Sequence, residues 1–126
     1  MQRYTLPKSE RLCSRRVIQQ LFDREGRDTK AYPLAYRVLS EPSESPSVEV
    51  IFAVSKRLHR RAVKRNLLRR RMREAYRLQK EPLWHYAEQQ GVSLKLSLRY
   101  ITKQEHSFKS IYNAVSKVVE HIQKGQ

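Results

Sequence analysis

The chain has 126 residues, a length typical of one domain, and 39% of them are hydrophobic, which allows a small core. Lysine and arginine number 27 against 12 aspartates and glutamates, which gives a formal net charge of +15. Such a charge favours a polyanionic partner, either nucleic acid or an anionic membrane surface. No run approaches the roughly 18 apolar residues of a membrane span, which argues against an integral membrane protein.

We expect one domain over residues 1–126, located in the cytoplasm and without a membrane partner. Met1 to Pro7 lacks the apolar core of a secretory signal, and the charged segment described below has no clean apolar face of the kind that binds membranes. The single cysteine, Cys13, excludes an internal disulfide and a multi-cysteine zinc site. We interpret it as a small packing residue.

Three segments in the first half of the chain have a regular apolar period. A short amphipathic helix is predicted from the N-cap Ser14 to Gly26, and its apolar residues are Val17, Ile18, Leu21 and Phe22. Two alternating segments then predict an antiparallel pair of strands, Tyr32 to Val38 and Val48 to Val54. A loop rich in proline and serine, Glu41 to Ser47, separates them.

The second half predicts a helix, a strand and a helix. From about residue 60 to residue 80 neither glycine nor proline interrupts a run of strong helix formers, until Pro82. Glu81 to Gly91 fits either a continued helix or a loop. Val92 to Tyr100 alternates most cleanly, which predicts a strand with one buried and one solvent-exposed face. Ser107 is a candidate N-cap for a last helix, whose apolar stripe should be core: Phe108, Ile111, Val115, Val118, Val119 and Ile122.

This order of elements predicts an α+β fold. We expect a single two-layer sandwich in which helices pack on a sheet of about four strands. Along the chain the order is helix, two or three strands, helix, strand, helix.

The positive charge is concentrated in one segment. Between Ser55 and Lys80 there are twelve basic residues and one acid, Glu74, so this stretch carries +11 of the total charge. On a helix, Arg65, Arg69, Arg73 and Arg77 would form a ridge about 18 Å long, enough to follow several phosphates. The other side is apolar and expected to pack: Val63, Leu67, Leu68, Met72 and Ala75. A solvated helix face usually mixes both signs of charge, so this pattern favours a nucleic-acid interface.

Asn66 lies among these arginines although asparagine has poor helix propensity. Its amide could bind RNA groups such as a 2′-hydroxyl, or it could bond a nearby backbone group. Its spacing favours neither interpretation.

The charged segment contains a recognisable motif. Arg65 to Arg73 reads RNLLRRRMR and matches the pattern R-N-x-x-[KR]-R-x-x-R at every defining position. It resembles the RNR motif of bacterial ribonuclease P proteins. The preceding Val54 to Arg61, the N-terminal Lys8 to Leu12, and the positions of Phe22 and Tyr36 are also similar to that family, so the resemblance covers most of the chain.

The resemblance implies a sandwich of ribosomal-protein type and a function. The chain would bind the catalytic RNA of ribonuclease P and the 5′ leader of precursor tRNA, and assist endonucleolytic removal of the leader. The implied contacts with the catalytic RNA are Lys56, Arg57, Arg60, Arg61, Lys64, Arg65, Asn66, Arg69, Arg70 and Arg73. The implied leader cleft is lined by Ile18, Phe22, Tyr36 and Phe52, where aromatic faces suit unpaired bases. At Ile18 many relatives have an aromatic residue instead.

The resemblance also implies that the RNA carries the chemistry. The protein would be an enzyme subunit without catalytic or metal-binding residues of its own, Mg²⁺ would be held mainly by the RNA, and one protein would bind each RNA. The residues agree, because the acids do not cluster for two metals and the histidines are scattered: His59, His85, His106 and His121. His59 could still contact RNA, since two arginines follow it.

Three other functions are open from the residues alone. A structural RNA-binding protein of the same fold would need the cationic helix but no second, single-strand site. A DNA-binding regulator would need a recognition helix with base-reading side chains and usually a dimer interface, and neither is indicated. A protein-only nuclease would keep its activity without RNA.

Overall fold

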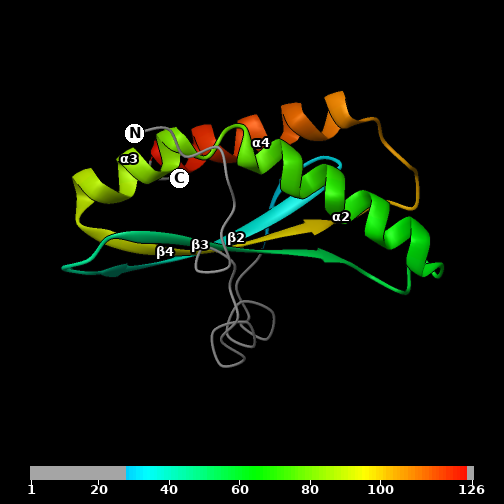
Figure 1. Ribbon diagram of the computed structural model, residues 1–126, viewed down its shortest axis with the longest axis horizontal. Helices are drawn as coiled ribbons and strands as arrows, with labels where there is room; N and C mark the ends of the chain where they lie inside the picture. The colour runs from blue at the N-terminus through cyan, green and yellow to red at the C-terminus, as the bar shows by residue number, and fades with distance from the viewer. Residues whose placement is uncertain (1–27, 125–126) are drawn as a thin grey trace.

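The computed structural model describes residues 28–124, so the predicted first helix and Cys13 lie outside the described residues. Within them the strands are β1 (Thr29–Ala31), β2 (Leu34–Pro42), β3 (Ser47–Val54) and β4 (Val92–Tyr100), and the helices are α2 (Ala62–Arg77), α3 (Glu81–Gln90) and α4 (Phe108–Gln123). All three helices lie on the same side of the sheet, which gives two layers (Figure 1). The predicted α+β class and the four-stranded sheet are confirmed.

The pairing of the strands differs from the predicted one. The sheet runs β1-β2-β4-β3, and β4 pairs antiparallel with β2 and parallel with β3. The prediction that β2 and β3 form an antiparallel pair is therefore wrong, because β4 lies between them. Two strand spacings amount to about 10 Å, and the four residues between Pro42 and Ser47 can span about 13 Å. A short loop therefore does not force its two strands to pair.

The two faces of β4 have different chemistry. On the helix side, Leu94, Leu96, Leu98 and Tyr100 are at most 2% exposed. The opposite face is polar, but the prediction that it is solvent-exposed is wrong at its centre, where Ser97 is 1% exposed. In the sheet register Ser97 lies between Arg37 and Ile51, whose side chains are much larger. A small residue in a central strand is shielded from water even on the polar face.

The predicted cationic helix is α2, and a separate short helix, α3, follows it. α2 ends at Arg77, and α3 begins at Glu81, so the segment left open by the sequence is helical. Pro82 lies in the first turn of α3, where its missing N–H needs no helical partner. Gly91 ends α3 with φ 64°, a left-handed conformation that glycine adopts without steric cost, and β4 starts at the next residue.

Helix α4 completes the core. The predicted cap is confirmed, since the Ser107 Oγ accepts a hydrogen bond from the Ser110 backbone N–H at 3.2 Å. The predicted stripe is buried as expected, with Phe108 half-buried at its start. α4 packs against α2, and α2 also contacts β3. These contacts fix which side of α2 faces inward and which faces solvent.

Candidate nucleic-acid interface

The exposed face of α2 follows from its buried face. Leu68 and Met72 are fully buried, so at about 100° per residue the outward direction is centred near Arg70. Arg70 is exposed, as are Asn66 and Arg73. The predicted ridge is not centred on this direction, because its first member, Arg65, lies beside the buried face and is only half-exposed.

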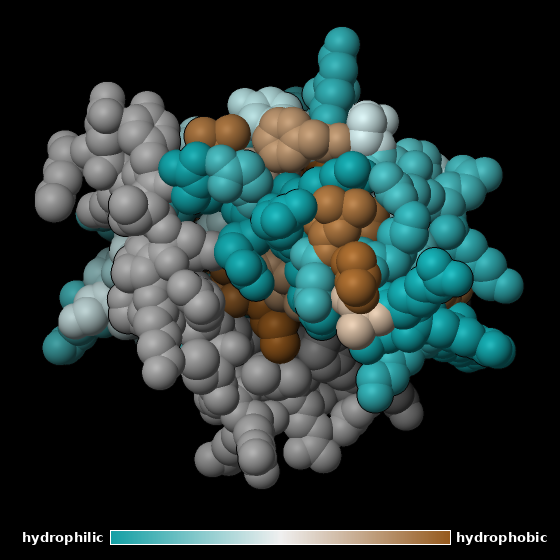
Figure 2. All heavy atoms as spheres, turned by 45° about the vertical axis from the view of Figure 1, so that its right-hand side comes forward, coloured by the Kyte–Doolittle hydropathy of each residue, from teal (hydrophilic) through white to brown (hydrophobic). Residues whose placement is uncertain are grey.

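A shallow groove runs along this outward face. It is lined by Val63, Asn66, Leu67, Arg69, Arg70 and Arg73. The prediction that Val63 packs inward is wrong, because the residue is 81% exposed. Figure 2 brings forward the end of the molecule where α2 begins and shows small apolar areas within a mostly hydrophilic surface. Guanidinium groups around an apolar floor can bind phosphates while the floor contacts ribose or base.

Several cations of α2 form hydrogen bonds and ion pairs with other parts of the protein. The Arg65 Nη1 donates hydrogen bonds to the carbonyl oxygens of His59 at 3.0 Å and of Arg60 at 2.7 Å. Lys64 forms an ion pair with Glu105, and the Arg71 Nη1 lies 3.1 Å from the same carboxylate. Hydrogen bonds from Lys64 and Arg71 lower the pKa of Glu105 below its ordinary value. These contacts tie the flank of α2 to the loop before α4.

Two further side-chain pairs lie within α2 itself. The Arg69 Nη2 donates to the Asn66 Oδ1 at 2.6 Å, so the Asn66 amide bonds a neighbouring side chain rather than the backbone. Glu74 forms an ion pair with Arg77, and the hydrogen bond from Arg77 is the main reason that the pKa of Glu74 is lowered. Glu74, the one acid between Ser55 and Lys80, is therefore paired with a cation.

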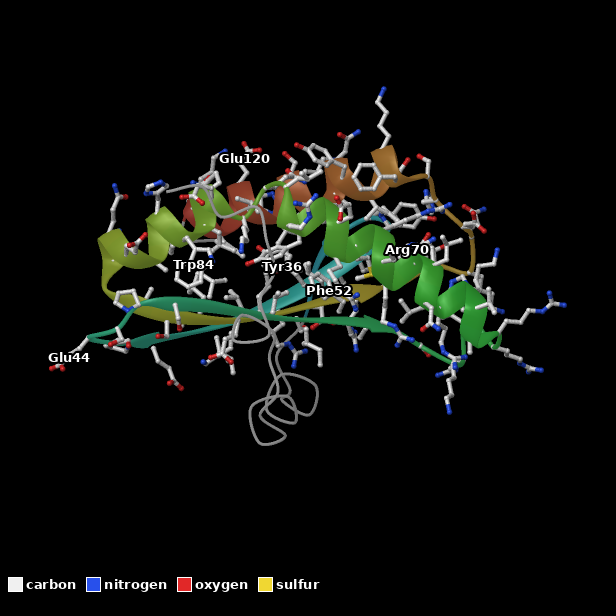
Figure 3. All side chains as sticks on the ribbon, viewed as in Figure 1. Tyr36, Glu44, Phe52, Arg70, Trp84 and Glu120 are labelled. Carbon is white, nitrogen blue, oxygen red and sulfur yellow. The ribbon has the colours of Figure 1, made fainter. Side chains whose placement is uncertain are left out.

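The remaining cations are available to a ligand. Six predicted RNA-binding side chains are exposed and have no ion pair or side-chain hydrogen bond within residues 28–124: Lys56, Arg57, Arg60, Arg61, Arg70 and Arg73. The first four lie in the lead-in, residues 55–61, which connects β3 to α2. Arg70 lies on α2, above the sheet in Figure 3. The fold thus brings the lead-in and the outward face of α2 together as one cationic surface.

A second hollow lies beside this surface. A cavity of about 570 Å³ lies at the ends of the parallel strands β3 and β4 and is lined by Ala53, Val54, Ser55, Arg57, Leu58, Arg99, Tyr100, Ile101 and Lys103. It combines apolar side chains with cations, a lining that suits an unpaired base and its phosphate. Sequence reasoning missed Leu58, Ile101 and Lys103 because it did not predict that β3 and β4 are neighbours. Arg57 belongs to both the cavity and the lead-in.

The predicted leader cleft is only partly within the described residues. Ile18 and Phe22 lie outside them. Tyr36 and Phe52 lie in one row of the sheet, on either side of Leu98, and both lie between the sheet and the helices in Figure 3.

Both aromatic side chains belong to the core. Tyr36 is 2% exposed, and burial raises its pKa. Phe52 is half-buried, with its ring centroid 5.9 Å from that of Tyr76. A base could stack on Tyr36 only if its present neighbours moved, so this assignment stays a prediction.

The histidines are less scattered in space than in sequence. His59 and His106 both contact the ring of Tyr100, with centroid distances of 5.5 and 6.4 Å. His85 lies 3.6 Å from Glu81, and His121 faces Tyr36. Over residues 28–124, no three histidine, cysteine or acidic side chains are grouped so that they could hold a metal ion. In the same range no helix is long and apolar enough to cross a membrane.

Comparison with known proteins identifies the family. A family model described as Ribonuclease P matches residues 6–123. The chain belongs to the ribonuclease P protein family. Ribonuclease P protein components are similar to it in sequence: one from Porphyromonas gingivalis is 34% identical, covering 90% of this chain and 83% of that protein. One from Chlorobium phaeobacteroides is 36% identical, covering 94% of this chain and 88% of that protein.

A solved structure agrees in fold. The ribonuclease P protein of Staphylococcus aureus superposes with a TM-score of 0.63 at 21% identity, covering 91% of this chain and 96% of that one. The resemblance based on the RNR motif is therefore confirmed. A ribonuclease P protein component is part of a ribonucleoprotein endoribonuclease that processes tRNA, so the family implies an RNA partner. A DNA-binding regulator is not supported.

Proposed function

We propose that this protein binds the catalytic RNA of ribonuclease P through the lead-in and the outward face of α2, and assists removal of the 5′ leader from precursor tRNA. The observation that carries the proposal is the set of six exposed cations on one surface, within and beside the RNR motif, that have no ion-pair partner among residues 28–124. Arginine in such a position can bind phosphate oxygens with two parallel hydrogen bonds.

The physical basis of this binding is neutralisation of phosphate charge. Each phosphate contact releases counterions from the RNA, so the affinity falls as the salt concentration rises. In the free protein the close cations repel one another, and the buried face of α2 holds the helix against that repulsion. The RNA relieves the repulsion when it binds. We assign the chemistry to Mg²⁺ held mainly by the RNA, with one protein per RNA.

The leader is proposed to pass through the cavity at the ends of β3 and β4. Apolar side chains there can contact unpaired bases of any sequence, and Arg57 and Lys103 can neutralise the phosphates between them. Because Arg57 also belongs to the lead-in, a leader in the cavity would lie next to the catalytic RNA. The cleft at Tyr36 and Phe52 is the alternative path.

The test of the function is cleavage of a precursor tRNA at low Mg²⁺. The cognate ribonuclease P RNA alone should be nearly inactive, because its phosphates are poorly neutralised, and addition of this protein should restore cleavage. The protein without RNA should not cleave. Tight RNA binding without rescue of cleavage would favour a purely structural RNA-binding protein, and cleavage by the protein alone would favour a nuclease.

The leader path has its own test. Lys103→Ala should weaken holoenzyme binding of a precursor with a leader about threefold to tenfold, and leave binding of the mature tRNA unchanged, because only the leader reaches the cavity. Binding of both RNAs is measured with Lys109→Ala as the control, since Lys109 is also an exposed lysine but lies on α4, outside the cavity. An unchanged preference for the leader in Lys103→Ala, with a loss in Phe52→Leu, would place the leader in the cleft instead.

A further inference from the structure

The lead-in is held in place although it is neither a helix nor a strand. Residues 55–61 have no regular structure longer than a turn, yet they carry four exposed cations. A flexible cationic segment must be ordered when it binds RNA, and that ordering opposes binding. One residue of the lead-in is buried, His59, with 6% of its surface exposed.

His59 contacts three different parts of the fold. Its Nε2 lies 2.8 Å from the Thr102 carbonyl oxygen, and because a carbonyl only accepts hydrogen bonds, the ring donates from Nε2. Its ring packs edge-on against Tyr100 at the end of β4. Its backbone N–H donates to the Ser55 carbonyl at 3.0 Å, and its own carbonyl accepts from Arg65. These contacts join the lead-in to β4, to the segment after β4 and to α2.

We propose that His59 is a positioning residue for RNA binding, which fixes the lead-in cations in the arrangement that meets the RNA phosphates. It does so without touching RNA, since its side chain is buried and its Nε2 is used by Thr102. The inference rests on the proposed function. Preorganisation of this kind raises affinity because less ordering remains to be done on binding.

The structure suggests variants that separate positioning from packing. His59→Phe keeps a ring of similar size against Tyr100 but cannot donate to the Thr102 carbonyl. His59→Gln keeps a donor that can reach the same oxygen. Ile111→Val is the stability control, because Ile111 is fully buried in α4 and lies outside the lead-in and the cationic surface.

The measurement is affinity for the ribonuclease P RNA over a range of salt concentrations, at a temperature where every variant is folded. His59→Phe should bind about tenfold more weakly, because a lead-in released from Thr102 must then be ordered on binding, with an unchanged salt slope because the same cations still meet phosphates. Amide hydrogen exchange in residues 55–61 should be faster than in the wild type. His59→Gln and Ile111→Val should bind like the wild type.

Some outcomes would contradict the positioning role of His59, and another would contradict the proposed function. Wild-type affinity in His59→Phe, or an equal loss in Ile111→Val, would overturn the positioning role. Equal losses in His59→Phe and His59→Gln, with slow exchange retained, would indicate a direct histidine contact with RNA and would also overturn it. If the wild-type protein does not bind the RNA at all, the proposed function itself fails.

Discussion

Replacing both Arg70 and Arg73 with alanine is expected to weaken binding to the ribonuclease P RNA about thirtyfold, if each contact contributes about 1 kcal/mol. Both side chains are exposed on the outward face of α2 and have no partner within the described part of the chain. The salt slope of the affinity should fall by about 1.4 to 1.8, because two phosphate contacts disappear. Equilibrium binding at four or more salt concentrations measures both quantities.

The matched control removes the same charge elsewhere on the helix. Arg71→Ala and Arg77→Ala together also remove two positive charges, but these arginines form ion pairs with Glu105 and Glu74. We expect a smaller loss of affinity and a nearly unchanged salt slope. If both double variants lose the same affinity with the same change of slope, the protein binds through its net charge, and α2 has no specific RNA-binding face.

Replacing Leu68 with alanine is expected to lower the free energy of unfolding by about 2 to 5 kcal/mol. Leu68 is fully buried, and its side chain belongs to the core cluster beneath α2. The loss combines the transfer free energy of the removed atoms with the cavity that they leave. Urea denaturation followed by circular dichroism measures the change, and the slope m should stay constant.

Val63→Ala is the control for this prediction. Val63 lies on the same helix but is 81% exposed, so its replacement should change stability by less than about 0.5 kcal/mol. Equal effects of the two substitutions would mean that α2 does not pack through Leu68. The side of the helix assigned to RNA would then be wrong as well, because the buried face defines the outward one.

The cationic interface could largely be predicted from the sequence, but the state of each cation could not. The run of basic residues and the order of the RNR motif are visible in the chain, and the family comparison confirms the motif. Glu105, which pairs with Lys64 and Arg71, is more than thirty residues away in sequence. Such ion pairs depend on how the loop before α4 lies against α2. No local sequence pattern indicates that arrangement.

The sequence by itself determined several of the elements and the partner class. Alternation defined β4 with its observed bounds, the cap at Ser107 placed the start of α4, and the concentrated charge indicated nucleic acid. These features depend on residues close together in the chain, so local rules of spacing and charge are sufficient.

The tertiary structure alone decided which strands are neighbours and which side chains are free. The insertion of β4 between β2 and β3 created the cavity at the strand ends, and it placed Thr102 where His59 can donate to it. It also put Tyr36 in the core. Pairing between distant strands is chosen by the burial of whole faces, which is a property of the assembled sheet rather than of any single segment.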